Sequence, residues 1–182
     1  MEFWDIYDEN KKPTGRTMKR NDWCLKDGEY HLTVLGVVAR PDGTFLITKR
    51  VMTKAWAPGW WEVSGGAAQA GEESYEAVLR EVKEETGLTL TSYKFRGLVT
   101  FINSECESEL MCVFTADEYA GELIECDEGE LCWVDKAMVP NLPAWEGDQV
   151  FLDLLLSGEK RFFSVKLQYE GDRLVEKKIH LY

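Results

Sequence analysis

The sequence predicts an α/β fold, an α/β/α sandwich in which helices cover both faces of a mixed β-sheet. Many short segments have the β-branched or alternating pattern of strands, whereas only two segments have the apolar spacing of helices. Strands mixed with so few helices imply a sheet that is sandwiched between them. The chain has 182 residues, of which 45% are hydrophobic, so it can bury a core without disulfides or a structural metal.

We expect one domain that spans residues 1–182. Its core covers about residues 29–158, and the two ends form extensions at residues 1–28 and 159–182. Both extensions have the pattern of β-hairpins, because each consists of two extended segments around a polar turn.

The N-terminal half of the core is predicted to begin with two strands. Residues 31–39 are rich in β-branched side chains, and residues 44–49 alternate between polar and apolar side chains. The segment 41–43, Pro-Asp-Gly, is a turn signal, so we expect the two strands to pair as a hairpin. A short strand follows at residues 60–63.

A helix is predicted from about residue 72 to residue 86, and Gly87 is its expected end. The remaining core elements are three strands and a second helix. The strands are expected at residues 93–102, 110–116 and 130–134, and the helix at residues 145–156.

The formal net charge of −12 argues against binding of a nucleic-acid polymer, because an acidic surface repels a phosphate backbone. A small phosphorylated ligand is still compatible with this charge if divalent cations bridge the two negative partners. The five cysteines have no metal-ligand or redox spacing and are expected to be reduced thiols. Since neither a signal peptide nor a membrane span is apparent, we expect a soluble protein in the cytoplasm that does not bind membranes.

Three glutamates lie on one face of the first predicted helix. At about 100° per residue, Glu81, Glu84 and Glu85 share this face, while the apolar side chains lie opposite and are expected to pack on the sheet: Tyr75, Val78, Leu79 and Val82. The small Ala77 is expected near the centre of the acidic face. Like charges at this spacing repel one another, so helix stability gives no reason for the cluster, whereas a hard divalent cation does.

Two neighbouring features support a metal site. Arg80 has a planar guanidinium that can hold carboxylates in a fixed orientation. The pair Gly65-Gly66 allows the main chain to approach a metal closely, so that a carbonyl oxygen can act as a ligand.

The segment from Gly66 to Leu88 satisfies the pattern G-x5-E-x7-R-E-U-x-E-E-x-G-U, in which U is aliphatic, at every specified position. This pattern is the Nudix box, and the chain therefore resembles the Nudix hydrolases, including the MutT-like members. The resemblance implies a Nudix sandwich with the family's loop–helix–loop. It also implies hydrolysis of a diphosphate linkage in a nucleotide-like small molecule.

The resemblance assigns roles by motif position. It implies Mg²⁺ as the cofactor, with Mn²⁺ able to substitute. The metal ligands would be Gly65 through its carbonyl, Glu81, Glu84 and Glu85. Arg80 would orient the glutamates, and Gly66, Glu72 and Gly87 would shape the loop–helix–loop. The catalytic residues that the resemblance implies in the box are Glu81, Glu84 and Arg80. The base can be a glutamate of the box or of a later loop, and outside the box the candidates are Glu128 and Glu130. A second acidic segment, Glu105, Glu107 and Glu109, is a weaker candidate.

Aromatic residues near the box are candidates for binding a nucleobase by stacking. Trp56 and Trp145 are the principal candidates, and Arg50 is a further candidate for substrate binding. Trp60 and Trp61 are expected to belong mainly to the core.

Residues 4–10, 13–17 and 28–31 resemble the leader of Nudix proteins related to isopentenyl-diphosphate isomerase. Residues 142–148 and 169–175 resemble the tail of MutT-like oxidised-dGTP diphosphatases. Isomerase activity is not expected, because residues 63–66 contain neither the cysteine nor the histidine that the isomerase needs. Met18 stands where a metal-binding histidine would be expected, and His31 is expected to be a packed side chain.

Our first expectation is therefore a Mg²⁺-dependent pyrophosphohydrolase of (deoxy)nucleoside triphosphates, including oxidised purines. One alternative is hydrolysis of nucleotide sugars or dinucleoside polyphosphates by the same machinery. Another is a non-catalytic nucleotide-sensing module. A homodimer is an open alternative to a monomer.

Overall fold

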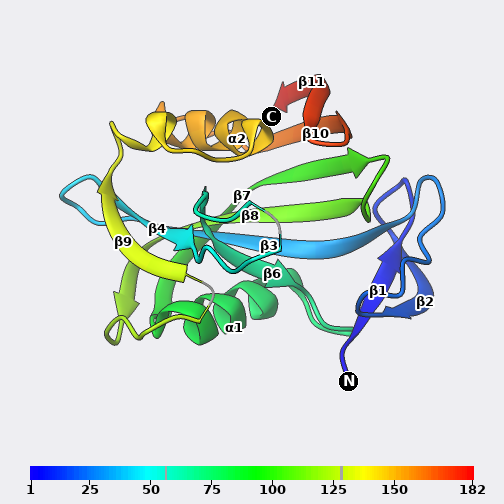
Figure 1. Cartoon of the computed structure of the whole chain (residues 1–182), viewed down its shortest axis with the longest axis horizontal. Helices are drawn as coiled ribbons and strands as arrows, with labels where there is room; N and C mark the ends of the chain where they lie inside the picture. Colours follow the sequence, from blue (N-terminus) through cyan, green and yellow to red (C-terminus); the bar gives the residue numbers. More distant parts are fainter. Residues whose placement is uncertain (56, 128) are drawn as a thin grey trace.

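The computed structural model describes residues 1–55, 57–127 and 129–182. It has two β-sheets and one long helix on each side of the larger sheet, so the predicted α/β sandwich with a mixed sheet is confirmed (Figure 1). Helix α1 (Ser74–Thr86) covers one face and helix α2 (Glu146–Leu156) covers the other.

The larger sheet has the strand order β11-β10-β7-β8-β3-β1-β2, and β6 pairs with β3 beside this path. Two neighbouring pairs are parallel, β3 with β8 and β10 with β7, and the other pairs are antiparallel. The strands of this sheet are β1 (Phe3–Tyr7), β2 (Pro13–Lys19), β3 (Tyr30–Val38), β6 (Ser64–Ala67), β7 (Thr89–Asn103), β8 (Glu109–Ala120), β10 (Phe163–Glu170) and β11 (Arg173–Leu181).

The smaller sheet has the order β5-β4-β9, with β5 (Trp61–Glu62), β4 (Thr44–Arg50) and β9 (Gly129–Asp135). The predicted hairpin between the first two core strands is therefore wrong beyond its turn. Only one bridge, between Ala39 and Phe45, joins these strands next to the turn, and β3 and β4 then enter different sheets. The alternating pattern predicted both strands correctly but carries no information about which partner each strand pairs with.

Each helix packs on its own layer of core side chains. Helix α1 buries Val78, Val82 and also Ala77 against one face of the larger sheet. The prediction that Ala77 lies on the open acidic face is thus wrong, and Tyr75, which was expected to pack on the sheet, is 46% exposed. The close approach of α1 to β6 turns the Ala77 side of the helix inward. Helix α2 buries its apolar side chains on the opposite face, where they contact β10 and its neighbours.

Hairpins occur at both ends of the chain, as predicted. Strands β1 and β2 pair with each other, and β1 also pairs with β3. A small cluster of Trp4, Ile6 and Met18 forms the core of this N-terminal hairpin. His31 is buried and stacks on Trp4 with 4.6 Å between the ring centroids, in agreement with a packed side chain. Strands β10 and β11 form the C-terminal hairpin.

Within the three described segments, the helices are all too short or too polar to cross a lipid bilayer.

Candidate active site on helix α1

Local sequence signals fix both ends of helix α1. At its start, Glu73 and Glu76 form a reciprocal capping box, in which each side chain accepts a hydrogen bond from the other residue's main-chain N–H. At its end, Gly87 has the left-handed conformation with φ of 81°, and its N–H donates to the carbonyl of Lys83. The helix therefore ends at the residue that the sequence predicts, and its acidic side chains are held in a fixed register.

The glycine pair brings the main chain of β6 into contact with the acidic side chains of α1. A Cβ atom on Gly66 would lie 2.6 Å from the Glu81 carboxylate, so any larger residue would displace that side chain. The N–H of Gly65 donates to Oε2 of Glu85 at 3.3 Å. The predicted proximity of this main chain to the acidic face is thus present.

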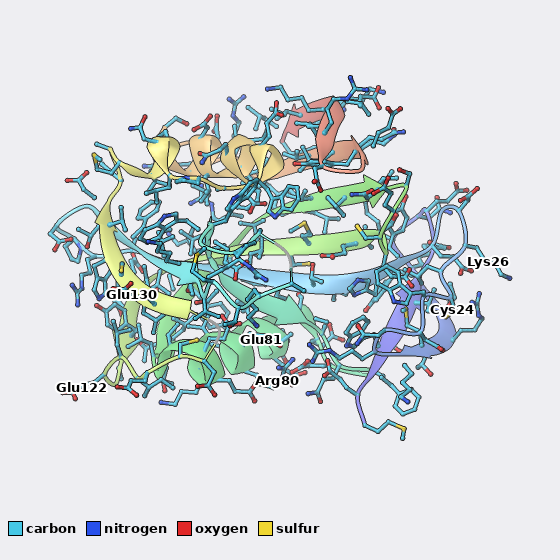
Figure 2. The ribbon with its side chains drawn as sticks, in the orientation of Figure 1. Cys24, Lys26, Arg80, Glu81, Glu122 and Glu130 are labelled. Atoms are coloured by element: carbon cyan, nitrogen blue, oxygen red, sulfur yellow. The ribbon has the colours of Figure 1, made fainter. Side chains whose placement is uncertain are left out.

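Arg80 joins the loop before the helix to the carboxylates on the helix. Its Nε and Nη2 atoms donate to the two oxygens of Glu72 at 2.8 and 2.9 Å, and Nη2 also donates to the carbonyl of Ala67 at 3.1 Å. Its Nη1 atom donates to Glu81 at 2.6 Å and to Glu84 at 3.4 Å. Figure 2 shows Arg80 on the side of α1 that lies nearer the N-terminal hairpin.

Burial and neighbouring groups shift the pKa values of the site's carboxyl groups in opposite directions. Burial raises the pKa of Glu81, the hydrogen bond from Arg80 opposes this, and the charges of Glu84 and Glu2 add to the rise. For Glu72, burial also favours a higher pKa, but the hydrogen bonds from Arg80 and from the Gln69 amide outweigh it, so its pKa is lowered. Burial thus disfavours the charged form of Glu81, which a further cation would favour.

The residues present fit a hard divalent cation by their chemistry. Glu81, Glu84 and Glu85 offer carboxylate oxygens, which Mg²⁺ and Mn²⁺ prefer. Among residues 1–55, 57–127 and 129–182, no three His, Cys, Asp or Glu side chains are close enough to share one ion. Instead, Arg80 donates to Oε1 of Glu81 and the Gly65 amide donates to Oε2 of Glu85, so a cation would bind these carboxylates beside their present partners.

Other predicted site residues belong to other elements or fall outside the described part of the chain. Trp56 and Glu128 fall outside the described residues. Glu130 lies on β9 with an exposed side chain. Arg50 donates from Nη1 to both oxygens of Glu62 at 2.8 and 2.9 Å. Trp145 precedes α2 and packs on Trp60 at 5.1 Å between ring centroids.

Sequence reasoning missed a small pocket between β5 and α2. Trp61, Glu62, Asp148 and Gln149 line it together with apolar side chains. Burial, followed by the charges of Glu62 and Glu109, raises the pKa of Asp148 to about 7. The Oε1 atom of Gln149 is buried and has no hydrogen-bond partner among the described residues. The segment that contains Asp148 carried the tail resemblance, but nothing in the sequence connected it with Glu62.

Glu109, from the weaker acidic segment, faces the same side of the sheet. Its Oε2 atom accepts a hydrogen bond from Thr33 at 3.0 Å, and burial raises its pKa to about 7. Its side chain is 29% exposed, and its charge acts on Asp148. The charge of Glu109 therefore contributes to the raised pKa of Asp148, although 39 positions separate the two residues in the sequence.

Known proteins resemble this chain in sequence and in fold. A family model described as the NUDIX domain matches residues 29–155. The uncharacterized Nudix hydrolase YvcI of Bacillus subtilis is 38% identical over 106 residues, which are 56% of this chain and 67% of that protein. The oxidized purine nucleoside triphosphate hydrolase of Danio rerio is 34% identical over 151 residues, which are 81% of this chain and 93% of that protein. The crystal structure of a MutT protein from Bacillus halodurans superimposes with a TM-score of 0.73 at 27% identity, covering 81% of this chain and 96% of that chain.

The chain belongs to the Nudix family, and it is a Nudix hydrolase. In this chain the family's box is formed by the capped helix α1 with its glutamates, together with the glycine pair of β6.

Proposed function

We propose that the chain is a Mg²⁺-dependent pyrophosphohydrolase that cleaves nucleoside triphosphates, with oxidised purine nucleotides as its substrates. The observation that carries this proposal is the fixed array around Arg80, which holds Glu72, Glu81 and Glu84 beside the Gly65-Gly66 main chain. A diphosphate carries several negative charges, so an acidic helix can bind it only through cations.

In this proposal Glu81, Glu84, Glu85 and the Gly65 carbonyl hold the metal, and Mn²⁺ can substitute for Mg²⁺. A bound divalent cation offsets the charge on the diphosphate oxygens and makes water more acidic. Arg80 keeps the carboxylates in place, and Glu72 keeps Arg80 in place through two hydrogen bonds. Glu84 is the most exposed carboxylate of the array, with 62% of its side chain accessible, so it is positioned to accept a proton from the attacking water.

The pocket between β5 and α2 is the proposed site for the nucleobase. Trp61 offers an aromatic surface, while Glu62, Asp148 and the unpartnered Oε1 of Gln149 offer polar atoms for the edge of a base. Its free volume of about 10 Å³ admits about one water molecule, so binding of a purine requires the pocket to widen. Strand β5, which contributes Trp61 and Glu62 to the pocket, directly precedes β6, which carries Gly65 and Gly66.

Arg50 and Trp145, the described substrate-binding candidates from the sequence, are each connected with a residue of this pocket. Arg50 is paired with Glu62, which lines the pocket, and Trp145 lies three positions before Asp148. We propose that both act on the nucleotide indirectly or at the rim, whereas Trp61 contacts the base.

The choice of oxidised purine nucleotides rests on likeness to the Danio rerio enzyme, whose name states that activity, over 81% of this chain. Carboxyl groups with a pKa near 7, such as Asp148, can either donate or accept a proton at neutral pH. An oxidised purine differs from its parent in the donors and acceptors on its ring edge, and a pocket with such a group can recognise this difference.

A substrate panel tests the proposal. Loss of substrate and formation of the nucleotide product would be followed by chromatography with 8-oxo-dGTP, dGTP, ADP-ribose, nucleotide sugars and dinucleoside polyphosphates, each with Mg²⁺, Mn²⁺ or EDTA. The proposal predicts metal-dependent turnover with the highest kcat/KM for the oxidised triphosphate. Higher kcat/KM for a nucleotide sugar or dinucleoside polyphosphate contradicts the substrate assignment, and nucleotide binding without turnover of any compound indicates a sensing module.

A further inference from the structure

The N-terminal hairpin, β1 and β2, touches the loop that carries the box into helix α1. We call residues 67–72 the box loop. The carbonyl of Phe3 accepts a hydrogen bond from the N–H of Ala70 at 2.8 Å. The Oδ2 atom of Asp5 accepts a hydrogen bond from the N–H of Gly71 at 2.7 Å. At the start of the box loop, Ala67 packs against the hairpin's own apolar cluster.

These contacts continue through the box loop to the proposed metal ligands. Gly71 precedes Glu72, whose Oε2 atom accepts the N–H of Gln69 at 2.8 Å and whose two oxygens bind Arg80. Arg80 in turn holds Glu81 at 2.6 Å. The chain of hydrogen bonds thus runs from the hairpin to the carboxylate that lies against Gly66.

The hairpin lies outside the part of the chain that the family model matches, which begins at residue 29. It is anchored independently of the box. Strand β1 pairs with β3, and Trp4 and Met18 are buried within the hairpin. The hairpin is therefore a fixed support against which the box loop rests.

We propose that the N-terminal hairpin positions the carboxylates of helix α1, and that Asp5 is the positioning residue through its hydrogen bond to Gly71. This inference rests on the proposed function, because it concerns the same metal site. Without the Asp5 contact, the Gly71–Glu72 segment loses its outer anchor, Glu72 holds Arg80 less firmly, and Glu81 samples orientations that do not bind the cation.

Substitution of Asp5 tests this proposal by a measurement that does not depend on turnover. Binding of Mn²⁺ to the full chain without nucleotide would be followed by electron paramagnetic resonance for the wild type, Asp5→Ala and Asp5→Asn. We expect Asp5→Ala to weaken Mn²⁺ binding about fivefold, the factor that corresponds to one hydrogen bond of ordinary net strength. Asp5→Asn keeps a side-chain oxygen that can accept the Gly71 N–H, so its affinity should stay within about twofold of the wild type.

Asp8→Ala is the matched control inside the same hairpin. Asp8 accepts the N–H groups of Asn10 and Lys12, both at 2.9 Å, and within the described part of the chain it forms no hydrogen bond with the box loop. The Asp8→Ala substitution should lower the melting temperature of the protein without changing its Mn²⁺ affinity. If Asp5→Ala does not fold, Asp5→Val, with a side chain that suits a strand, replaces it.

Kinetics supply the second readout. At saturating metal, Asp5→Ala should lower kcat and leave KM for the nucleotide within about twofold, because none of the residues that line the base pocket belongs to the N-terminal hairpin. Mn²⁺ affinity of Asp5→Ala equal to that of the wild type, or an equal loss in Asp8→Ala, overturns this inference while the wild-type activity stands. A wild-type protein that neither binds Mn²⁺ nor turns over nucleotide overturns the proposed function and this inference together.

Discussion

Arg80 donates from one guanidinium nitrogen to Glu81 at 2.6 Å and from its other two to Glu72, so a single side chain connects the box loop with the acidic face of helix α1. The planar fork of arginine can make these contacts together, whereas a lysine ammonium is a point charge that cannot reach both partners with the same geometry. The orientation of the proposed metal ligands therefore depends on the shape of this residue as well as on its charge.

Arg80→Lys should lower kcat/KM by about 10- to 100-fold, the usual cost of removing a group that orients a metal ligand. The charge is kept, so a loss of this size would reflect geometry. Steady-state kinetics at several Mg²⁺ concentrations measure it. Arg161→Lys is the control, since Arg161 forms an exposed pair with Glu159. Equal kcat/KM values for Arg80→Lys and the wild type would show that orientation by Arg80 is unimportant.

Glu84→Gln should leave the fold intact, because 62% of the Glu84 side chain is exposed. It should lower kcat on the order of 100-fold or more, since it removes a charge from the array that stabilises the reaction. Thermal denaturation and steady-state kinetics measure the two effects separately. Glu118→Gln removes an exposed charge from β8 and should change neither the thermal stability nor kcat. Near-wild-type kcat in Glu84→Gln would argue against the assignment of the array.

Gly66→Ala should reduce activity without unfolding the protein. The added Cβ atom would lie 2.6 Å from the Glu81 carboxylate and would displace it. A displacement of this kind at a catalytic group lowers activity on the order of 100-fold. Activity and Mn²⁺ affinity should fall together, while the far-ultraviolet circular dichroism spectrum stays unchanged. Full activity of the alanine variant would mean that Glu81 need not occupy its place beside Gly66.

The pKa of Asp148, raised to about 7 by burial and then by the charges of Glu62 and Glu109, makes folding stability depend on pH. Unfolded Asp has a pKa of about 4, so between pH 4 and pH 7 the folded state holds a proton that the unfolded state has lost. This contribution to stability is complete below pH 4 and disappears as the pH rises through 7.

Asp148→Asn should remove that dependence. Urea denaturation at pH 5 and at pH 8 should show a smaller loss of unfolding free energy in the variant than in the wild type, because the amide does not titrate. Identical losses in the two proteins would place the pKa of Asp148 near its ordinary value. Asp153→Asn is a suitable control, because Asp153 is an exposed residue on the same helix.

The local parts of the fold and site followed from the sequence, because their causes are local. The box predicted helix α1 and its end at Gly87. The orientation of the helix was predicted less well: Ala77 is buried and Tyr75 is exposed, since the approach of β6 decides which side turns inward.

Contacts between distant segments could not be predicted. Three such contacts join residues from different elements. They are the pairing of Glu62 with Arg50, the proximity of Asp148 to Glu62 and Glu109, and the Asp5–Gly71 hydrogen bond. Each depends on how strands pair, and the alternation of side chains within one strand does not specify its partner.

The location of the cation in a crystal of the protein grown with Mn²⁺ and a nonhydrolysable nucleoside triphosphate tests the central claim most directly. Anomalous scattering identifies Mn²⁺ independently of the model used for the protein. The account predicts a peak between the Gly65 main chain and the carboxylates of Glu81, Glu84 and Glu85, in contact with the triphosphate. A peak elsewhere, with the triphosphate bound away from helix α1, would contradict it.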